Sequence, residues 1–313
     1  IQVVYGPRNT GEAAPPTEAT QPPWAARGAS PYPEPMKSIY TYGGKPARRN
    51  LTLADLQAAK GKQKFSQTCV DSQEEAAAAV AAGIDILSVT CPHTASIREA
   101  APETFCHSAV MLTDYTTEES VINAAFEAMT DGADMIYTIR SLKTITTLAE
   151  MNIPVMGHLG LVPRHSTWTG GLRAVGKNAD EAFNLFLQFR RLEDAGAVAA
   201  EVEVVPEEVL AEISPRTGLI TSSIGAGAAG DIQFLFMSDI CGEGEAPPRH
   251  ARAYGDLRRL REQIRRERVA CLRAFHDDVK SGGFPGREEV VRMPAGELDI
   301  FREKLARFEQ QER

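Results

Sequence analysis

A chain of 313 residues is long enough for one α/β barrel of about 250 residues with appendages, and too short for two catalytic domains of usual size. Hydrophobic residues make up 43% and charged residues 24%, and no apolar run approaches the ~18 residues of a membrane span, which predicts a soluble protein. The net charge of -8 argues against a nucleic-acid partner, because phosphate binding depends on clustered Lys and Arg.

The cysteine count and the first residues of the chain indicate the cellular compartment. An odd count of five cysteines without a CxxC spacing does not suggest a disulfide framework. The segment Ile1–Val4 lacks the charged and long apolar regions of a secretory signal. Together these features predict a cytoplasmic protein.

Residues 1–47 form a Pro/Gly-rich arm. Pro15, Pro16, Pro22 and Pro23 lie in a stretch crowded with Gly, Ala and Ser. Such a composition buries little apolar surface by itself. We therefore expect the arm to lie against its own domain or a neighbouring subunit.

From Leu51 onward, helical and strand-like segments alternate. Amphipathic stretches end in Ala-Gly or Asp-Gly, where glycine can adopt the left-handed conformation that stops a helix. A capping box at Thr116 and Glu119 predicts a helix through Met129, and a second helix is expected over 180–192. Short apolar runs between them suit strands buried on both faces. These strands are predicted at 85–90, 109–114, 135–139, 154–160, 198–204 and 219–224.

The repeated βα order predicts an α/β fold of the (β/α)8 TIM barrel class over residues 48–286. A long charged helix is expected from Tyr254 to Val279, followed by a C-terminal helical tail over 287–313. The Arg-rich part of that helix alternates with acidic residues at helical spacing, which favours a solvated face over a phosphate-binding one.

Polar residues that close the apolar runs are candidates for chemistry, because barrel enzymes carry their sites at the carboxyl ends of the strands. A histidine and two carboxylates at one mouth could perform acid–base catalysis, since burial and mutual repulsion raise the pKa of a carboxyl group. Any one of them could equally be a helix cap or a structural ion pair. The candidates are Thr90, Cys91, His93, Asp114, Thr138, Arg140, His158, Glu203, Ser222 and Ser223.

Four ordered motifs resemble the ketopantoate hydroxymethyltransferase family. They are Gly-His-Leu-Gly within 153–163, the glycine-rich segment 170–177, the segment 195–206 with its Glu-Val-Val-Pro, and the Gly-Ala-Gly loop with the segment that follows it, at 224–242. The resemblance extends from about Leu51 to Gly286.

This resemblance implies a barrel of the phosphoenolpyruvate/pyruvate-type superfamily, commonly assembled as a homo-oligomeric decamer. The family transfers a one-carbon unit from methylenetetrahydrofolate to a small 2-oxo acid, with Mg²⁺ or another divalent metal stabilising an enolate. On matching positions, Glu203 resembles the general base, Asp114 a metal-site aspartate, and His158 the histidine that lines the site.

Two family motifs are replaced. The strand-end Gly-Asp-Ser of the family is Thr90-Cys91-Pro92 here, so an aspartate ligand and a substrate-binding serine are absent. The family's Lys-x-Glu is Tyr137-Thr138-Ile139. Because Mg²⁺ prefers oxygen ligands, these replacements are expected to weaken its binding severely.

Three hypotheses follow from the residues. The first is a diverged hydroxymethyltransferase or aldolase-type enzyme in which Arg140 or Arg173 binds the substrate carboxylate, aided by Thr90 and Ser222. The second is a transition-metal-dependent lyase, in which Asp114 joins a Cys-x-His pair made of Cys91 and His93. The third is a non-catalytic barrel that serves as a binding or scaffold subunit.

Overall fold

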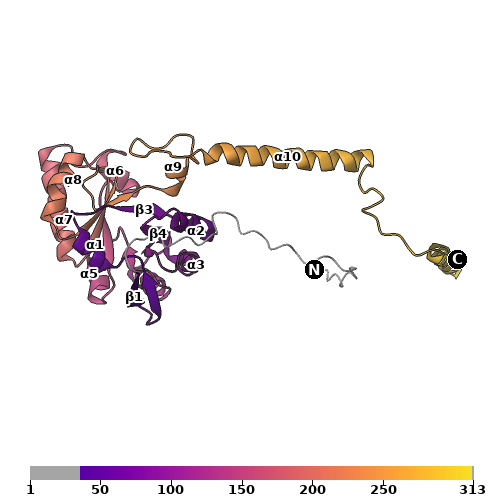
Figure 1. Cartoon of the computed structure of the whole chain (residues 1–313), viewed down its shortest axis with the longest axis horizontal. Helices are drawn as coiled ribbons and strands as arrows, with labels where there is room; N and C mark the ends of the chain where they lie inside the picture. The colour runs from indigo at the N-terminus through magenta and orange to yellow at the C-terminus, as the bar shows by residue number, and fades with distance from the viewer. Residues whose placement is uncertain (1–35, 312–313) are drawn as a thin grey trace. The chain divides into compact units, whose positions relative to one another are not determined.

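A closed parallel barrel is the centre of the fold. The computed structural model describes residues 36–311. Within them, eight parallel strands pair in the ring order β10, β3, β4, β5, β6, β7, β8, β9, which confirms the predicted (β/α)8 class (Figure 1). The strands are β3 (Phe65–Cys69), β4 (Ile86–Thr90), β5 (Phe105–Ala109), β6 (Met135–Tyr137), β7 (Val155–Gly160), β8 (Ala199–Glu203), β9 (Ile220–Ile224) and β10 (Ile232–Phe234).

Helices follow the strands and cover the outside of the barrel (Figure 1). Side-chain caps open α1, α2, α4, α5 and α7, and the box that opens α4 is formed by Thr117 and Ser120, one residue later than predicted. The helices are α1 (Leu53–Ala59), α2 (Gln73–Ala81), α3 (Thr94–Ala100), α4 (Glu118–Thr130), α5 (Leu142–Glu150), α6 (Ser166–Thr169), α7 (Ala179–Asp194), α8 (Glu207–Ile213) and α9 (Met237–Cys241). Short 3₁₀ turns are η1 (Cys91–His93), η2 (Pro163–His165) and η3 (Ser214–Arg216).

One predicted strand was placed too late in the chain. The run 109–114 was expected to be a strand, but β5 is Phe105–Ala109. Val110, which follows, is only 2% exposed and packs in the core outside any strand, so hydrophobicity alone could not separate the strand from its loop. Strands β3 and β10 were not predicted, because β3 contains the polar sequence Ser-Gln-Thr and β10 spans only three residues.

The barrel interior is built in layers that differ in polarity. The layer nearest the amino ends of the strands is apolar. Each strand contributes one side chain to it: Phe65, Ile86, Phe105, Met135, Met156, Ala199, Ile220 and Ile232. Side chains alternate along a strand, so the residues two positions further on form the next layer. That layer is mostly polar: Gln67, Ser88, His107, Tyr137, His158, Glu201, Ser222 and, as the exception, Phe234. A polar floor therefore lies beneath the barrel mouth.

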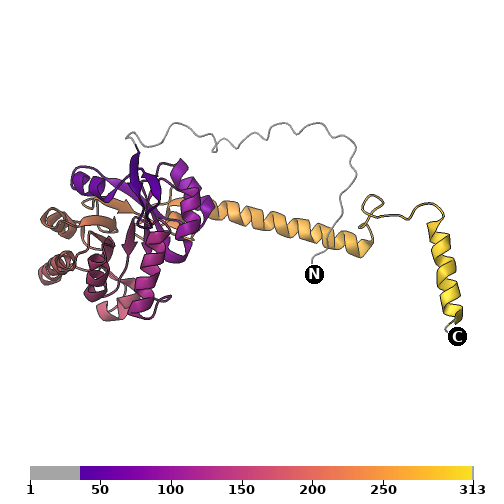
Figure 2. The same ribbon diagram turned by 90° about the horizontal axis from the view of Figure 1, so that it is seen from below.

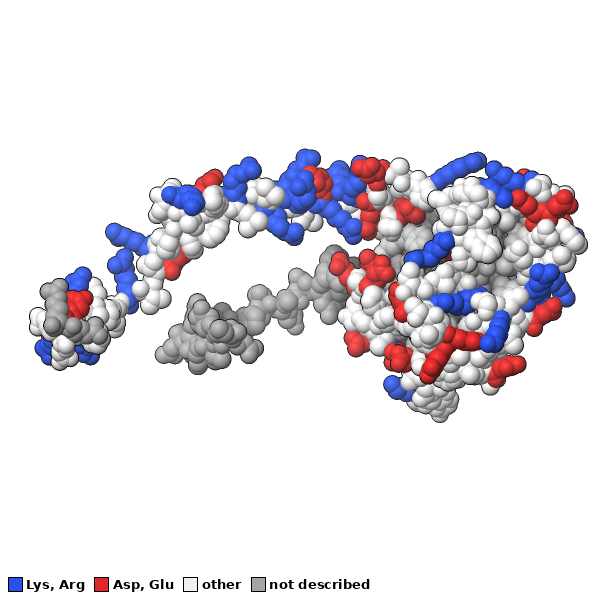
Figure 3. All heavy atoms as spheres, turned by 180° about the vertical axis from the view of Figure 1, so that it is seen from behind, with Lys and Arg blue, Asp and Glu red and all other residues white. Residues whose placement is uncertain are grey.

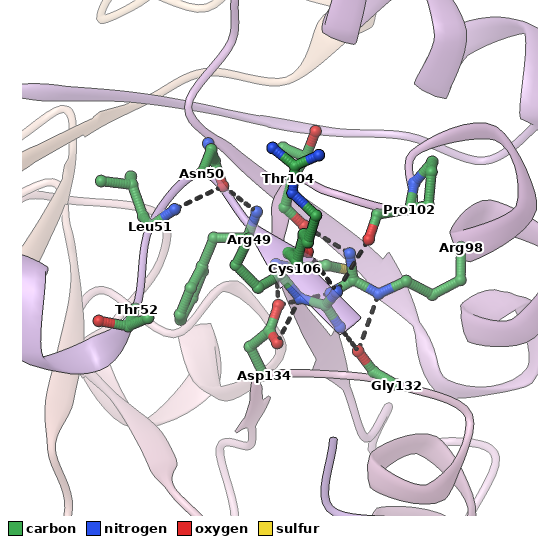
Figure 4. Close-up of polar contacts among 12 residues, drawn as sticks. Arg49, Asn50, Leu51, Thr52, Arg98, Pro102, Thr104, Cys106, Gly132 and Asp134 are labelled. Atoms are coloured by element: carbon green, nitrogen blue, oxygen red, sulfur yellow. Dashed lines mark hydrogen bonds and ion pairs between the residues drawn. The ribbon is translucent and has the colours of Figure 1, made fainter. Parts of the chain in front are cut away.

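A β-hairpin precedes the barrel and is tied to the amino ends of its strands. It comprises β1 (Lys37–Tyr40) and β2 (Pro46–Arg49), while residues 1–35 of the predicted arm lie outside the described residues. Arg49 Nε lies 2.8 Å from Asp134 Oδ1, and Arg98 pairs with the other oxygen of that carboxylate (Figure 4). Asn50 Oδ1 accepts a hydrogen bond from the Phe105 amide at 2.7 Å. This buried network stabilises the face opposite the barrel mouth.

The described chain divides into two compact units. Residues 36–240 and 247–253 form the barrel unit, and residues 241–246 and 254–311 form the second, so the boundary expected at residue 286 falls inside the second unit. The second unit contains α10 (Leu257–Ser281), which confirms the predicted long helix, and α11 (Glu297–Gln311) (Figure 2). Basic side chains gather along α10 (Figure 3). None of the helices within residues 36–311 is long and apolar enough to cross a membrane.

Candidate active site

A cavity of about 370 Å³ lies at the carboxyl ends of the barrel strands. This end of a barrel is where enzymes of the class carry their active sites. Much of the lining is apolar and comes from residues such as Val89, Val110, Met111, Ile139, Val162 and Phe236. Polar lining residues come from β4 and the loop after β3 (Asp71, Ser88 and Thr90) and from β6 to β8, so the cavity can hold a small molecule that has both polar and apolar parts.

His158, Glu201 and Glu203 line the cavity from β7 and β8, and we call them the β7–β8 wall. His158 Nδ1 lies 3.2 Å from Glu201 Oε1, and His158 Nε2 lies 3.6 Å from Glu203 Oε2. Tyr137 on β6 completes the group, because its hydroxyl lies 2.8 Å from His158 Nδ1 and 3.1 Å from Glu201 Oε1. The structure thus brings the two predicted catalytic residues, His158 and Glu203, together at the cavity.

The environment shifts the pKa values of this wall. Burial raises the pKa of Glu203 to about 7, with His158 lowering it and Glu201 raising it. Burial alone would lower the pKa of His158, but the hydrogen bond and the charge of Glu201, the Leu161 carbonyl and Glu203 together raise it. A carboxyl group with a pKa near neutrality can both accept and release a proton at working pH.

The backbone next to Glu203 is strained. Val204 has a φ of 46°, a left-handed conformation that a β-branched residue rarely adopts. Two hydrogen bonds hold it there: the Val204 amide donates to the Ile224 carbonyl at 2.9 Å, and the Val204 carbonyl accepts from the Val175 amide at 3.1 Å. Such strain costs about 1–3 kcal/mol and concentrates at functional sites, which supports a functional role for the preceding carboxylate.

The positions that match the family's metal site do not fit Mg²⁺. We call Cys91, Asp114 and Ile139, which follow β4, β5 and β6, the β4–β6 rim. The Cys91 side chain is buried in the hydrophobic core, and burial raises the pKa of its thiol to about 12. Ile139 offers no ligand atom, and the exposed Asp114 accepts a hydrogen bond from its neighbour Thr113. A protonated thiol and an alkyl group cannot replace two carboxylates around a hard cation.

The Cys91–His93–Asp114 site of the zinc hypothesis is also not assembled. Among the described residues, these three do not form a group with mutually close ligand atoms. His93 is exposed, and its Nδ1 lies 3.2 Å from the Thr90 hydroxyl. Cys91 faces the core instead of the cavity centre.

The donor atoms of the β7–β8 wall do lie within 4.8 Å of one another, a spacing that a metal ion could use. Both imidazole nitrogens of His158 are engaged, however. Nε2 lies 2.7 Å from the Leu161 carbonyl oxygen, and Nδ1 faces Tyr137 and Glu201. A metal would have to displace one of these hydrogen bonds, so the group is better described as a hydrogen-bonded relay.

The predicted substrate-binding residues have different surroundings. Thr90 lines the cavity. Ser222 is buried and donates to Gln67 Oε1 at 3.0 Å in the polar floor. Arg140 donates to the carbonyls of Leu112 and Tyr115 and does not line the cavity.

Arg173 is exposed and paired with Glu181 at 2.9 Å, away from the cavity lining. The structure therefore brings neither of the two predicted arginines to the cavity. Among the described residues that line it, Arg164 is the only Lys or Arg, and it was not predicted.

Glu201 was also missed, although the sequence carried a signal for it. In the strand Ala-Ala-Glu-Val-Glu, residues 201 and 203 are two positions apart and share one face. Tyr137 had been noted only as the replacement of the family lysine. Its position opposite Glu201 depends on strand pairing, which the residue pattern alone does not supply.

Known proteins match most of this chain. The sequence model described as ketopantoate hydroxymethyltransferase matches residues 86–287. A 3-methyl-2-oxobutanoate hydroxymethyltransferase of Kosmotoga olearia is 31% identical over 266 residues, covering 77% of this chain and 97% of that protein. One of Pyrococcus furiosus is 31% identical over 268 residues, covering 77% and 91%. A solved 2,3-dimethylmalate lyase of the PEP mutase/isocitrate lyase superfamily is 14% identical, covering 84% and 99%, with a TM-score of 0.44.

Proposed function

The chain belongs to the ketopantoate hydroxymethyltransferase family, and from that premise we propose that it adds a hydroxymethyl group to a small 2-oxo acid through an enolate at the barrel mouth. The observation that carries the proposal is the carboxyl group of Glu203. It lies at the cavity beside His158, with a pKa raised by burial to about 7.

The acceptor in this proposal is a 2-oxo acid with an apolar side chain. Met111, Val162 and Phe236 offer an apolar surface for that side chain, and Arg164 is the cation available for the carboxylate. The relatives named above are 3-methyl-2-oxobutanoate hydroxymethyltransferases, so 3-methyl-2-oxobutanoate is the first acid to test.

Glu203 takes the proton in the first step. Its ionised carboxylate accepts the hydrogen from C3, the carbon next to the keto group, and the electron pair of that C–H bond moves to the keto oxygen as an enolate. A base of pKa about 7 is well matched to this step, because it is partly ionised at neutral pH and still binds a proton firmly. The enolate carbon then attacks the one-carbon electrophile.

Methylenetetrahydrofolate is the proposed donor, as the family implies. With it, water adds to the methylene carbon and the two C–N bonds of that carbon break, which releases tetrahydrofolate and formaldehyde. The enolate carbon bonds to the formaldehyde carbon, and the proton held by Glu203 goes to the resulting alkoxide. NMR of the product with and without this donor tests the assignment. The homo-oligomer implied by the family also stays a proposal, which light scattering tests.

Deuterium exchange tests the enolate directly. With 3-methyl-2-oxobutanoate in D₂O and no one-carbon donor, the protein should catalyse exchange of the C3 hydrogen, followed by NMR. Glu203→Gln should slow this exchange by about 10²–10⁴-fold, because the residue loses its proton-accepting oxygen while keeping its shape. Glu208→Gln, an exposed residue on α8, is the matched control and should exchange at the wild-type rate.

No exchange by the wild-type protein with any 2-oxo acid would exclude the enolate mechanism and favour the non-catalytic scaffold. Exchange that survives in Glu203→Gln would leave the mechanism but remove Glu203 as its base.

A further inference from the structure

The hydrogen bonds around His158 fix where its protons lie. A carbonyl oxygen can only accept, so the 2.7 Å contact with the Leu161 oxygen places a proton on Nε2. On the other side, Nδ1 faces the Tyr137 hydroxyl at 2.8 Å and Glu201 Oε1 at 3.2 Å. Because Tyr137 donates its single proton to Glu201, Nδ1 can take part in this network only as a donor. A histidine that donates from both nitrogens is an imidazolium.

The burial of Glu201 leads to the same protonation state. Its side chain is 9% exposed, and among the described residues His158 is its only ion-pair partner. An ionised carboxylate in such a place is costly unless a cation and hydrogen bonds compensate it. His158 supplies the cation and Tyr137 the hydrogen bond, and the raised pKa of His158 agrees with this pairing.

The other titratable groups of the polar floor do not compete for this role. Burial lowers the pKa of His107 to about 4, so this ring, 6.0 Å from that of Tyr137, is neutral. Burial raises the pKa of Cys69 to about 12 and that of Tyr137 well above its usual value. Glu203, 3.6 Å from His158 Nε2, is the remaining group that can change charge near neutral pH.

We propose that Glu201 and Tyr137 hold His158 as an imidazolium, and that this cation stabilises the enolate oxygen in the cavity through its charge, while both of its N–H groups keep their present partners. The enolate role rests on the proposed function above. Glu201 and Tyr137 act through His158 and are positioning residues. Two features depart from the family resemblance: Tyr137 stands where the family has lysine, and the β4–β6 rim does not fit the metal that would carry the positive charge.

The charges balance along the step. The C3 proton goes to the Glu203 carboxylate, which becomes neutral, and the electron pair becomes the charge on the enolate oxygen. One negative charge therefore moves from Glu203 to the enolate oxygen, and the net charge of the cavity and its substrate does not change. Preoriented charge of this kind needs no reorganisation when the reaction occurs.

NMR of the imidazole nitrogens, recorded on the ¹⁵N-labelled full chain without substrate, tests the protonation state. The signal of His158, assigned by its loss in His158→Gln, should be that of an imidazolium at pH 7. Glu201→Gln should convert it to the neutral ring with the proton on Nε2, and Tyr137→Phe should lower its titration midpoint by a smaller amount. Glu208→Gln, the surface control, should leave it unchanged.

Exchange in D₂O then tests the enolate role. Glu201→Gln should slow C3–H exchange by about 10²-fold, and a chelator should not affect the wild-type rate. A neutral His158 at pH 7 in the wild-type protein, or an imidazolium that persists in Glu201→Gln, would overturn the proposal. So would exchange that a chelator abolishes and Mg²⁺ restores. If the wild-type protein shows no exchange, the enolate role fails together with the proposed function, whereas the NMR result still decides the protonation state independently.

Discussion

The β4–β6 rim and the β7–β8 wall both follow or end strands at the carboxyl end of the barrel, and they differ in what they can do. The rim holds a buried thiol, an alkyl group and an exposed carboxylate bonded to its neighbour. The wall holds a histidine between two carboxylates, with Tyr137 bonded to the histidine and to Glu201. The comparison teaches that the strand ends of one barrel can differ sharply in charge, because each strand contributes its own side chains to the carboxyl end.

Breaking the wall should have the largest effect on stability. Glu201→Ala removes a hydrogen-bond partner of both His158 and Tyr137, so the free energy of unfolding should fall by about 1–3 kcal/mol. Urea denaturation measures this change. Asp114→Ala, the same kind of truncation on the exposed rim, should cost less than about 0.5 kcal/mol. Equal losses of unfolding free energy in the two variants would show that the contacts of Glu201 stabilise the fold no more than those of the exposed Asp114.

The pH dependence of stability should also come from the wall. Glu203 has a folded-state pKa of about 7 against an ordinary 4.5, so the folded chain holds a proton there that the unfolded chain has released. Its contribution is therefore full below pH 4.5 and is lost as pH rises through 7, which corresponds to about 3 kcal/mol. The raised pKa of His158 has the same sign: its contribution is full below 6.5 and is lost above the folded pKa.

Denaturation at a series of pH values checks this sign. Between pH 4.5 and 7 the unfolding free energy should fall more steeply in the wild-type protein than in Glu203→Gln. A slope that the substitution leaves unchanged would mean that Glu203 titrates normally.

Arg164, the cation in the cavity lining, should show a smaller effect, on substrate binding. Arg164→Ala should raise the KM for a 2-oxo acid by about 10-fold, or about 1.4 kcal/mol, with little change in kcat, because it removes a contact made equally in substrate and transition state. Steady-state kinetics measures both constants. If Arg173→Ala had the larger effect, the exposed pair with Glu181 would have to open and reach the cavity.

The smallest expected effect concerns the backbone of the wall. Val204→Gly removes the strain of the positive φ and should raise the unfolding free energy by about 1 kcal/mol, measured by thermal denaturation. The same substitution should slow C3–H exchange, because Glu203 loses its fixed orientation. A destabilised variant would show that the valine side chain contributes more through packing than the conformation costs.

The sequence predicted the barrel and part of the site. Helix-ending glycines and short apolar runs were enough for the βα order, and the Gly-His-Leu-Gly and Glu-Val-Val-Pro motifs singled out His158 and Glu203. Asp114 was expected at a strand end because the apolar run 109–114 was interpreted as a strand. In the structure it lies five residues beyond β5, and only the fold could show that Val110 to Leu112 are core and cavity lining.

The pairing of Glu201 with Tyr137 could not be predicted from the residues. It joins β8 to β6 through the histidine of β7, so it depends on the relative register of three strands. Alternation would have placed Glu201 beside Glu203, but not its hydrogen-bond partner on another strand.

The most direct test of this account measures C3–H exchange in Glu201→Gln and Asp114→Asn, side by side, with and without a chelator. If positive charge on the β7–β8 wall stabilises the enolate, Glu201→Gln should exchange about 10²-fold more slowly than the wild-type protein. Asp114→Asn should stay within about twofold, and the chelator should change neither. A large loss of exchange rate in Asp114→Asn, together with the same loss when the chelator is added to the wild-type protein, would contradict the account. It would show that a metal bound at the β4–β6 rim stabilises the enolate.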